Sequence, residues 1–154
     1  MIHGAYVGIP ADARTQAQAE CEAFVADHIA RRVSFAVETT LRSRAALVQA
    51  DDARRAGFRT FLIYVCAGDV EENLQRVARR GLRGGHAAHE AEIRDIFAKS
   101  LDNLAAARPV FDEADLYDTS VRWAPPVRVV ALRDGELACA SPLPAWVPAP
   151  WKPS

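Results

Sequence analysis

Cysteine is scarce in this sequence, and its placement excludes two common kinds of site. The 154 residues contain three cysteines, Cys21, Cys66 and Cys139, and no Cys-x-x-Cys pair. An odd number of widely separated cysteines argues against a disulfide framework and against a thiolate zinc site. The pattern is typical of a reducing compartment, so we expect a cytoplasmic protein.

Long apolar runs and an excess of charge are missing as well. No segment approaches the roughly 20 apolar residues that span a bilayer, and the first ten residues lack the features of a signal peptide. The formal net charge of −1 creates no global field that would attract nucleic acid or an anionic membrane. Basic and aromatic residues do not interleave as they do in proteins that bind single-stranded nucleic acid. We therefore expect neither a membrane nor a nucleic-acid partner.

What remains is the composition of a globular protein, with 50% hydrophobic and 25% charged residues. The length predicts a single domain, which we place at residues 1–141. Residues 142–154 hold five of the nine prolines together with Trp146 and Trp151. We expect this tail to be an extended strap that its tryptophans pack against the domain.

Hydrophobic periodicity predicts helices and strands in alternation. Phe61–Cys66 is a continuous apolar run, which indicates a strand buried on both faces and hence a parallel sheet. We predict an α/β fold of three layers, a mostly parallel sheet flanked by helices, closed by a hairpin around Asp134 and Gly135. The expected helices cover residues 12–31, 45–57, 69–80 and 90–108, and the expected strands cover residues 33–38, 61–66, 114–120 and 127–140.

Polar residues follow the strand predicted at residues 33–38. In such sheets ligands bind beyond the carboxyl ends of the strands, so this position suits a binding site. The alternative is a solvent-facing strand end at which Thr40 or Ser43 caps the next helix. The residues concerned are Glu38, Thr39, Thr40 and Arg42.

A second candidate is an arginine stripe at spacing i, i+3, i+4 and i+7, formed by Arg76, Arg79, Arg80 and Arg83. Guanidinium groups on one helical face followed by a glycine-rich loop suit phosphate binding. A solvated basic face is the alternative. The neighbouring His86 and His89 match neither HExxH nor HxxEH, and we expect no metal site there.

Five segments in order across residues 33–120 resemble one family, the zeta toxin-like P-loop small-molecule kinases, which include UDP-N-acetylglucosamine kinases. The segments are "SFAVETTLRSR", "GFRTFLIYV", "RVARRGLRGGH", "IRDIFAKSLDNL" and "DLYDTS". The resemblance implies a P-loop kinase-like sheet, ATP with Mg²⁺ as phosphoryl donor and a UDP-sugar or similar hydroxyl compound as acceptor. It also implies two groups of site residues. Glu38, Thr40 and Arg42 match the motif that contacts the acceptor, with Thr39 between them. Arg76 and Arg83 match the catalytic arginines that clamp the ATP phosphates, with His86 beside them and Arg80 as an alternative.

One departure from this family bears directly on activity. Its members carry a GxxGxGK[ST] loop after a first strand and an acidic base on a later one, and this sequence contains no Gly-Lys-Ser/Thr. The missing backbone cradle, lysine and Mg²⁺-binding hydroxyl supply the positioning on which phosphoryl transfer depends. We therefore expect little or no kinase activity and doubtful ATP binding.

The same departure leaves the origin and role of the chain open. If the chain is a kinase domain truncated at its N-terminus, its missing first strand has three possible explanations. The start codon is misassigned, the sheet is rearranged, or a second chain completes it. The alternative functions are a non-catalytic module that binds a nucleotide sugar or a protein, such as an antitoxin or another copy of itself, and a fragment that does not fold well alone.

Overall fold

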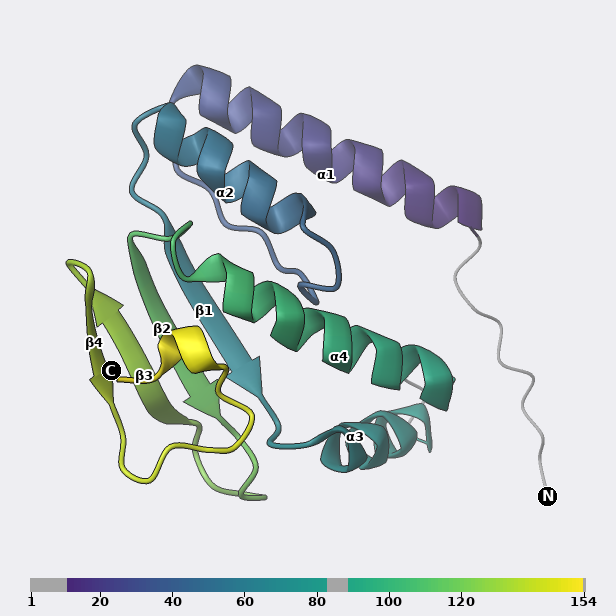
Figure 1. Cartoon of the computed structure of the whole chain (residues 1–154). Coiled ribbons are helices and arrows are strands. Elements are labelled where there is room, and N and C mark those ends of the chain that lie inside the picture. The colour runs from purple at the N-terminus through teal and green to yellow at the C-terminus, as the bar shows by residue number, and fades with distance from the viewer. Residues whose placement is uncertain (1–10, 83–88, 154) are drawn as a thin grey trace.

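The computed structural model describes residues 11–82 and 89–153 and shows a mixed α/β fold, as predicted (Figure 1). Four strands form one open sheet in the order β1-β2-β3-β4. The described helices and the closing hairpin lie close to their predicted positions. The elements are α1 (Ala11–Arg31), α2 (Ala45–Arg55), β1 (Phe61–Cys66), α3 (Val70–Leu82), α4 (Glu90–Ala107), β2 (Glu113–Asp118), β3 (Val127–Arg133), β4 (Glu136–Cys139) and the 3₁₀ turn η1 (Ala149–Trp151).

The prediction of a mostly parallel sheet is wrong for the described strands. Only β1 and β2 run parallel, whereas β2–β3 and β3–β4 are antiparallel. A parallel pair needs a long crossover, and α3 and α4 supply one between β1 and β2. The connection at residues 119–126 and the turn at Asp134 (φ 50°) and Gly135 (φ 82°) are too short for a second crossover.

Residues 33–38 do not form the predicted strand. They belong to no sheet, and β2 is the only strand paired with β1 in the described structure. A strand is stabilised by a hydrogen-bonded neighbour, and here the segment makes side-chain contacts instead. The Phe35 ring lies 6.0 Å from Phe58 and 5.9 Å from His28, between ring centroids.

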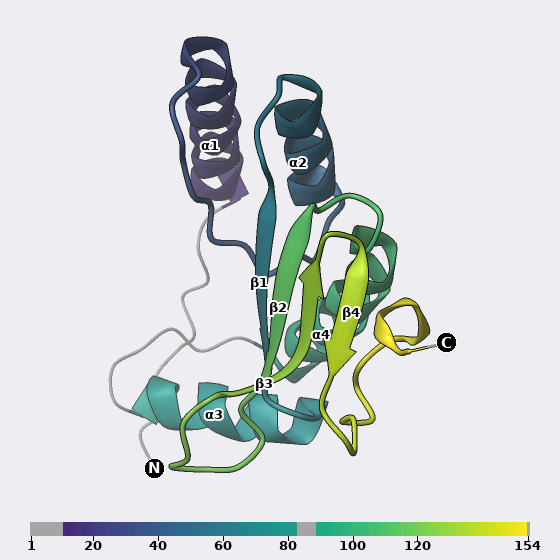
Figure 2. The same cartoon turned by 90° about the vertical axis from the view of Figure 1, so that its left-hand side faces the viewer.

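The core lies between one face of the sheet and α4. Leu104 of α4, Leu116 of β2 and Val130 of β3 are fully buried. The C-terminal tail closes this layer, with Trp151 completely buried and its indole Nε1 donating to the Leu104 carbonyl oxygen at 2.7 Å. Trp146 is only 8% exposed. The predicted packing of the tail by its tryptophans is therefore confirmed, although the tail forms turns and η1 rather than a fully extended strap. Figure 2 shows η1 beside β4 on the α4 side of the sheet.

On the opposite face of the sheet, no helix of the described residues covers β1. Phe61, Ile63 and Val65 are 45%, 63% and 57% exposed, while Cys66 is buried. The apolar run therefore reflects a strand with one covered and one open face, and the prediction of burial on both faces is wrong. Three complete layers are not present in the described residues, because α4 and the tail both cover the same face (Figure 2).

Helix α1 lies along the outside of the molecule (Figure 1). Of its described side chains only Val25 is buried, at 3% exposure. Across residues 11–82 and 89–153, no helix combines the length and the apolar character needed to cross a bilayer.

Candidate functional site

A groove opens where the parallel strands β1 and β2 end, beside α3. Its volume is about 890 Å³, which falls within the range of small-molecule sites. We call it the carboxyl-end groove. It is lined by Val65, Ala67, Glu72, Asn73, Arg76, Arg79, Thr119, Val121, Arg122, Trp123 and Ala124.

Arg76, which lines this groove, is fixed by three hydrogen bonds. Its Nε donates to Glu72 Oε1 at 2.9 Å, its Nη1 donates to Thr119 Oγ1 at 3.0 Å, and its Nη2 donates to the Thr119 carbonyl oxygen. Thr119 is itself held, because its backbone N–H and its hydroxyl both donate to the Cys66 carbonyl oxygen, at 2.8 and 3.0 Å. The guanidinium thus ties α3 to the ends of β1 and β2, and two of its five N–H donors remain for a ligand.

The charge of the carboxyl-end groove is positive. Glu72 lies between two arginines, with its Oε2 3.5 Å from Arg122 Nη2. The hydrogen bond from Arg76 and the charge of Arg122 hold the pKa of Glu72 below its ordinary value, so this carboxylate stays ionised at neutral pH. The three lining arginines, including Arg79, and this one glutamate leave a formal charge of +2, which favours an anionic ligand.

The turn between β1 and α3 forms one wall of the groove. Asp69 Oδ1 accepts a hydrogen bond from the Glu72 N–H at 2.8 Å and so caps the start of α3. Gly68 has φ of 96° and packs against Ser120. Ser120 is fixed by Asp118, which accepts hydrogen bonds from its N–H and its hydroxyl, both at 2.9 Å.

Gly68→Ala should lower the free energy of unfolding by about 2–4 kcal/mol. A Cβ there would lie 2.8 Å from Ser120 Cβ, in a backbone conformation that already disfavours side chains. Gly57→Ala is the matched control, because Gly57 has φ of 90° and no atom lies within 4 Å of the position that its Cβ would take. The control should cost about 1–2 kcal/mol in urea denaturation. Equal losses in the two variants would show that Gly68 and Ser120 are not in tight contact.

The groove offers binding groups rather than an evident nucleophile or base. Burial raises the pKa of the Cys66 thiol at the end of β1 to about 11, which keeps it protonated at neutral pH. Glu72 is a poor base because two arginines hold its carboxylate. No three histidine, cysteine, aspartate or glutamate side chains of the described residues form a metal-binding group. The arrangement can therefore bind and orient an anion.

The segment after the predicted first strand lies away from this groove. Glu38 is exposed, Thr39 Oγ1 accepts a hydrogen bond from the Leu41 N–H at 3.1 Å, and Arg42 Nη1 lies 3.9 Å from Glu92 Oε1 on α4. The Leu41 carbonyl accepts from Asn103 Nδ2 at 2.8 Å, which fastens the segment to α4. None of Glu38, Thr39, Thr40 and Arg42 lines the carboxyl-end groove.

The helix-capping role predicted in the alternative for this segment is wrong, although Glu38 is exposed as that alternative expected. Helix α2 begins after Arg44, which is its N-cap residue, and no side chain caps it. Neither Thr40 nor Ser43 therefore performs the predicted capping role.

The arginine stripe is only partly described. Arg76 and Arg79 line the groove. The side chain of Arg80, and all of Arg83 and His86, lie outside the described residues. The structure thus brings two arginines of the stripe together in one cavity, without Glu38 or Arg42. Of these two, Arg76 is the one that the family resemblance assigned to phosphate binding.

Most lining residues had no predicted role in a site, among them Glu72, Thr119, Arg122 and Trp123. Thr119 stands in the "DLYDTS" segment, where a polar residue follows a strand end. Arg122 and Trp123 stand just before Pro125 and Pro126. An aromatic residue beside a basic one in a short proline-bounded loop was a signal that could have marked them.

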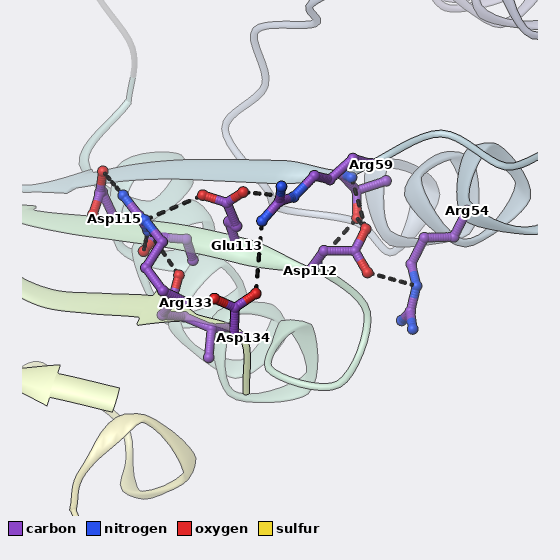
Figure 3. A network of polar contacts seen from close by, with 10 residues as sticks. Arg54, Arg59, Asp112, Glu113, Asp115, Arg133 and Asp134 are labelled. Carbon is purple, nitrogen blue, oxygen red and sulfur yellow. Dashed lines mark hydrogen bonds and ion pairs between the residues drawn. The ribbon is translucent and has the colours of Figure 1, made fainter. Parts of the chain in front are cut away.

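A second polar cluster lies at the opposite end of the sheet, where β1 and β2 begin (Figure 3). Arg59 Nε lies 2.7 Å from Glu113 Oε1, and Arg133 lies 3.1 Å from Glu113 Oε2 and 2.9 Å from Asp115 Oδ2. Arg54 Nε lies 3.3 Å from Asp112 Oδ1. These arginines already have carboxylate partners within the chain, so the cluster fastens strands to one another.

Asp112 makes this second cluster sensitive to acid. Its Oδ2 accepts from the Thr60 N–H at 2.8 Å and the Thr60 hydroxyl at 3.0 Å. The bond from the Thr60 backbone is the main cause that holds the pKa of Asp112 below its ordinary value, and the charge of Arg54 adds to it. A lowered folded-state pKa gives stability that is present above the unfolded value, about 3.9, and is lost as pH falls through the folded value.

Asp112→Asn should therefore destabilise the protein at pH 7 and have a smaller effect at an acid pH below about 3.9, as the Asp112 carboxylate of the parent takes up its proton. Comparing the variant with the parent protein at each pH cancels the titration of the other carboxyls. Thr60→Val removes the hydroxyl, which donates to Asp112 Oδ2 at 3.0 Å and accepts from the Asp112 N–H at 3.2 Å. Because the Thr60 N–H still donates to Asp112, this variant should give a smaller pH-dependent difference of the same sign. An Asp112→Asn effect of equal size at both pH values, measured by urea denaturation, would contradict this assignment.

Compared with protein-family models, curated proteins and solved structures, the chain gives no match. The chemistry of the carboxyl-end groove is therefore argued from its own residues.

Proposed function

We propose that the chain binds the phosphates of a nucleotide-type small molecule in the carboxyl-end groove, and that it does so as a non-catalytic homologue of the zeta toxin-like kinases. The observation that carries this proposal is the position of Arg76. Its guanidinium is fixed by Glu72 and Thr119, and it lies in one groove with Arg79 and Arg122. Planar guanidinium groups form paired, charge-assisted hydrogen bonds with phosphate oxygens.

The fold supports the same proposal. The parallel unit of β1, α3, α4 and β2 places the groove beyond the carboxyl ends of two parallel strands, which is where α/β sheets bind ligands. We propose that this unit corresponds to the P-loop kinase-like part of the sheet, and that the antiparallel β3 and β4 extend it. Arg76 is the residue at which the family resemblance and the groove geometry coincide.

The groove suits the phosphates of ATP or a UDP-sugar better than it suits a bound Mg²⁺. Magnesium prefers carboxylate, hydroxyl and water oxygens. Glu72 and Thr119, which line the groove, already accept hydrogen bonds from Arg76. Because the sequence also has no Gly-Lys-Ser/Thr loop, we expect binding without phosphoryl transfer.

Two measurements on the unmodified chain test the proposal. Calorimetric titration with ADP, ATP and UDP-N-acetylglucosamine, without and with Mg²⁺, should show binding that weakens as salt is added and does not depend on Mg²⁺. A coupled ADP-release assay with ATP and UDP-N-acetylglucosamine should show no turnover. Absence of binding at millimolar ligand would overturn the binding role, and robust ADP release would overturn the non-catalytic one.

A further inference from the structure

Trp123 is a large apolar side chain with almost no contact to the rest of the described protein. It is 92% exposed and lines the carboxyl-end groove. The other two tryptophans behave differently, because Trp146 is 8% exposed and Trp151 is fully buried. An indole in this position contributes little to packing and leaves its ring available to a ligand.

The backbone around Trp123 is nevertheless held in place. Arg122, the preceding residue, donates from Nη2 to Gln75 Oε1 at 3.2 Å and lies 3.5 Å from Glu72 Oε2. The Ala124 N–H donates to the Val121 carbonyl oxygen at 3.4 Å and closes a turn. Trp123 itself has φ of 65°, a conformation that bulky residues seldom adopt. An anchored arginine on one side and Pro125–Pro126 on the other fix the place from which the indole projects.

We infer that Trp123 is a stacking platform for the base of a nucleotide, and that it makes the carboxyl-end groove selective for nucleotides over inorganic polyphosphate. This inference rests on the proposed function, because Arg76, Arg79 and Arg122 bind the phosphates. An aromatic face and a cluster of guanidinium groups in one groove match a ligand that has a flat π system and an anionic group. Polyphosphates and sugar phosphates lack the flat ring, so they gain nothing from Trp123.

Stacking on Trp123 should raise the affinity for nucleotides by a predictable factor and should do so for different bases. Base–aromatic stacking of this kind raises affinity by about 5- to 100-fold, and it tolerates different bases because each has a π face. Val121, which is 68% exposed and lines the same groove, adds apolar surface beside the indole. We therefore expect ADP and UDP both to bind more tightly than pyrophosphate, which carries a similar phosphate group without a base.

Calorimetric titrations of ADP and of pyrophosphate into the parent chain and three variants test this assignment. Trp123→Ala should weaken ADP binding by about 5- to 100-fold and leave pyrophosphate affinity unchanged. Trp123→Phe should keep most of the ADP affinity, because it retains an aromatic face. Arg76→Ala should weaken both ligands, and circular dichroism should show that each variant is folded.

Iodide quenching gives an independent reading of the same contact. Trp123 is the exposed tryptophan, so ADP should protect the fluorescence of the parent chain from iodide while pyrophosphate protects it much less. Equal affinity of the parent for ADP and pyrophosphate, or an unchanged ADP affinity in Trp123→Ala, would overturn the platform and leave phosphate binding intact. Binding of neither ligand by the parent would overturn the proposed function, and the platform with it.

Discussion

Replacing Trp151 with alanine should lower the free energy of unfolding by about 3–5 kcal/mol, which is typical of a buried tryptophan removed from a core. The side chain is fully buried beneath α4 and packs near the Arg108 guanidinium, whose Cζ lies 5.9 Å from the ring centroid. Its indole Nε1 donates to the Leu104 carbonyl oxygen at 2.7 Å. The substitution therefore removes apolar burial and leaves a buried carbonyl without this donor.

A loss of this size is a large part of the total, since domains of this kind are stable by about 5–15 kcal/mol. Trp151→Phe separates the two contributions, because it keeps most of the packing and should cost about 1–3 kcal/mol for the lost hydrogen bond. Trp123→Ala is the matched control at an exposed tryptophan and should stay within about 0.5 kcal/mol of the parent. Urea denaturation followed by far-ultraviolet circular dichroism measures all three. A change below about 1 kcal/mol in Trp151→Ala would show that the tail is not part of the cooperative core.

Replacing Arg76 with alanine should weaken the binding of phosphate-bearing ligands by about 10- to 100-fold. Hydrogen bonds that involve a charged group contribute about 1.5–3 kcal/mol, and Arg76 has two N–H donors free of the contacts to Glu72 and Thr119. Its loss also releases Glu72, whose carboxylate would then oppose an anion. The lost hydrogen bonds and the exposed Glu72 carboxylate both weaken the binding of an anion.

Two further variants show whether the loss of affinity in Arg76→Ala comes from the lost guanidinium geometry or from the lost charge. Arg76→Lys keeps the charge but lacks the planar fork, so it should recover only part of the affinity. Arg55→Ala removes an exposed arginine of α2, which pairs with Asp51 and does not line the groove, and it should bind as the parent does. Calorimetry with ADP at two salt concentrations gives the affinities. Equal weakening by Arg55→Ala and Arg76→Ala would mean that the groove has no specific phosphate site.

Local features of this protein could be predicted from its sequence because each depends on neighbours within a few residues. The helical periodicity of α1 to α4 is of this kind, as are the Asp69 cap and the turn at Asp134 and Gly135. Composition also sufficed for the tail, because two tryptophans among prolines are stabilised by burial against a nearby core. In the carboxyl-end groove, the helical spacing of Arg76 and Arg79 predicted that they would share a face.

Features that depend on residues far apart in the chain were decided by the tertiary structure. Residues 33–38 carry a strand-like pattern, yet no described strand pairs with them, and the apolar run of β1 gave no sign that Ile63 would lie on an open face. Strand direction followed from the lengths of the connections, and the groove followed from the meeting of α3 with the loop that carries Thr119, Arg122 and Trp123. Sequence patterns record which side chains favour burial or a helical face. Which segments come together depends on hydrogen bonding and packing between residues far apart in the chain, and only the folded chain brings those partners into contact.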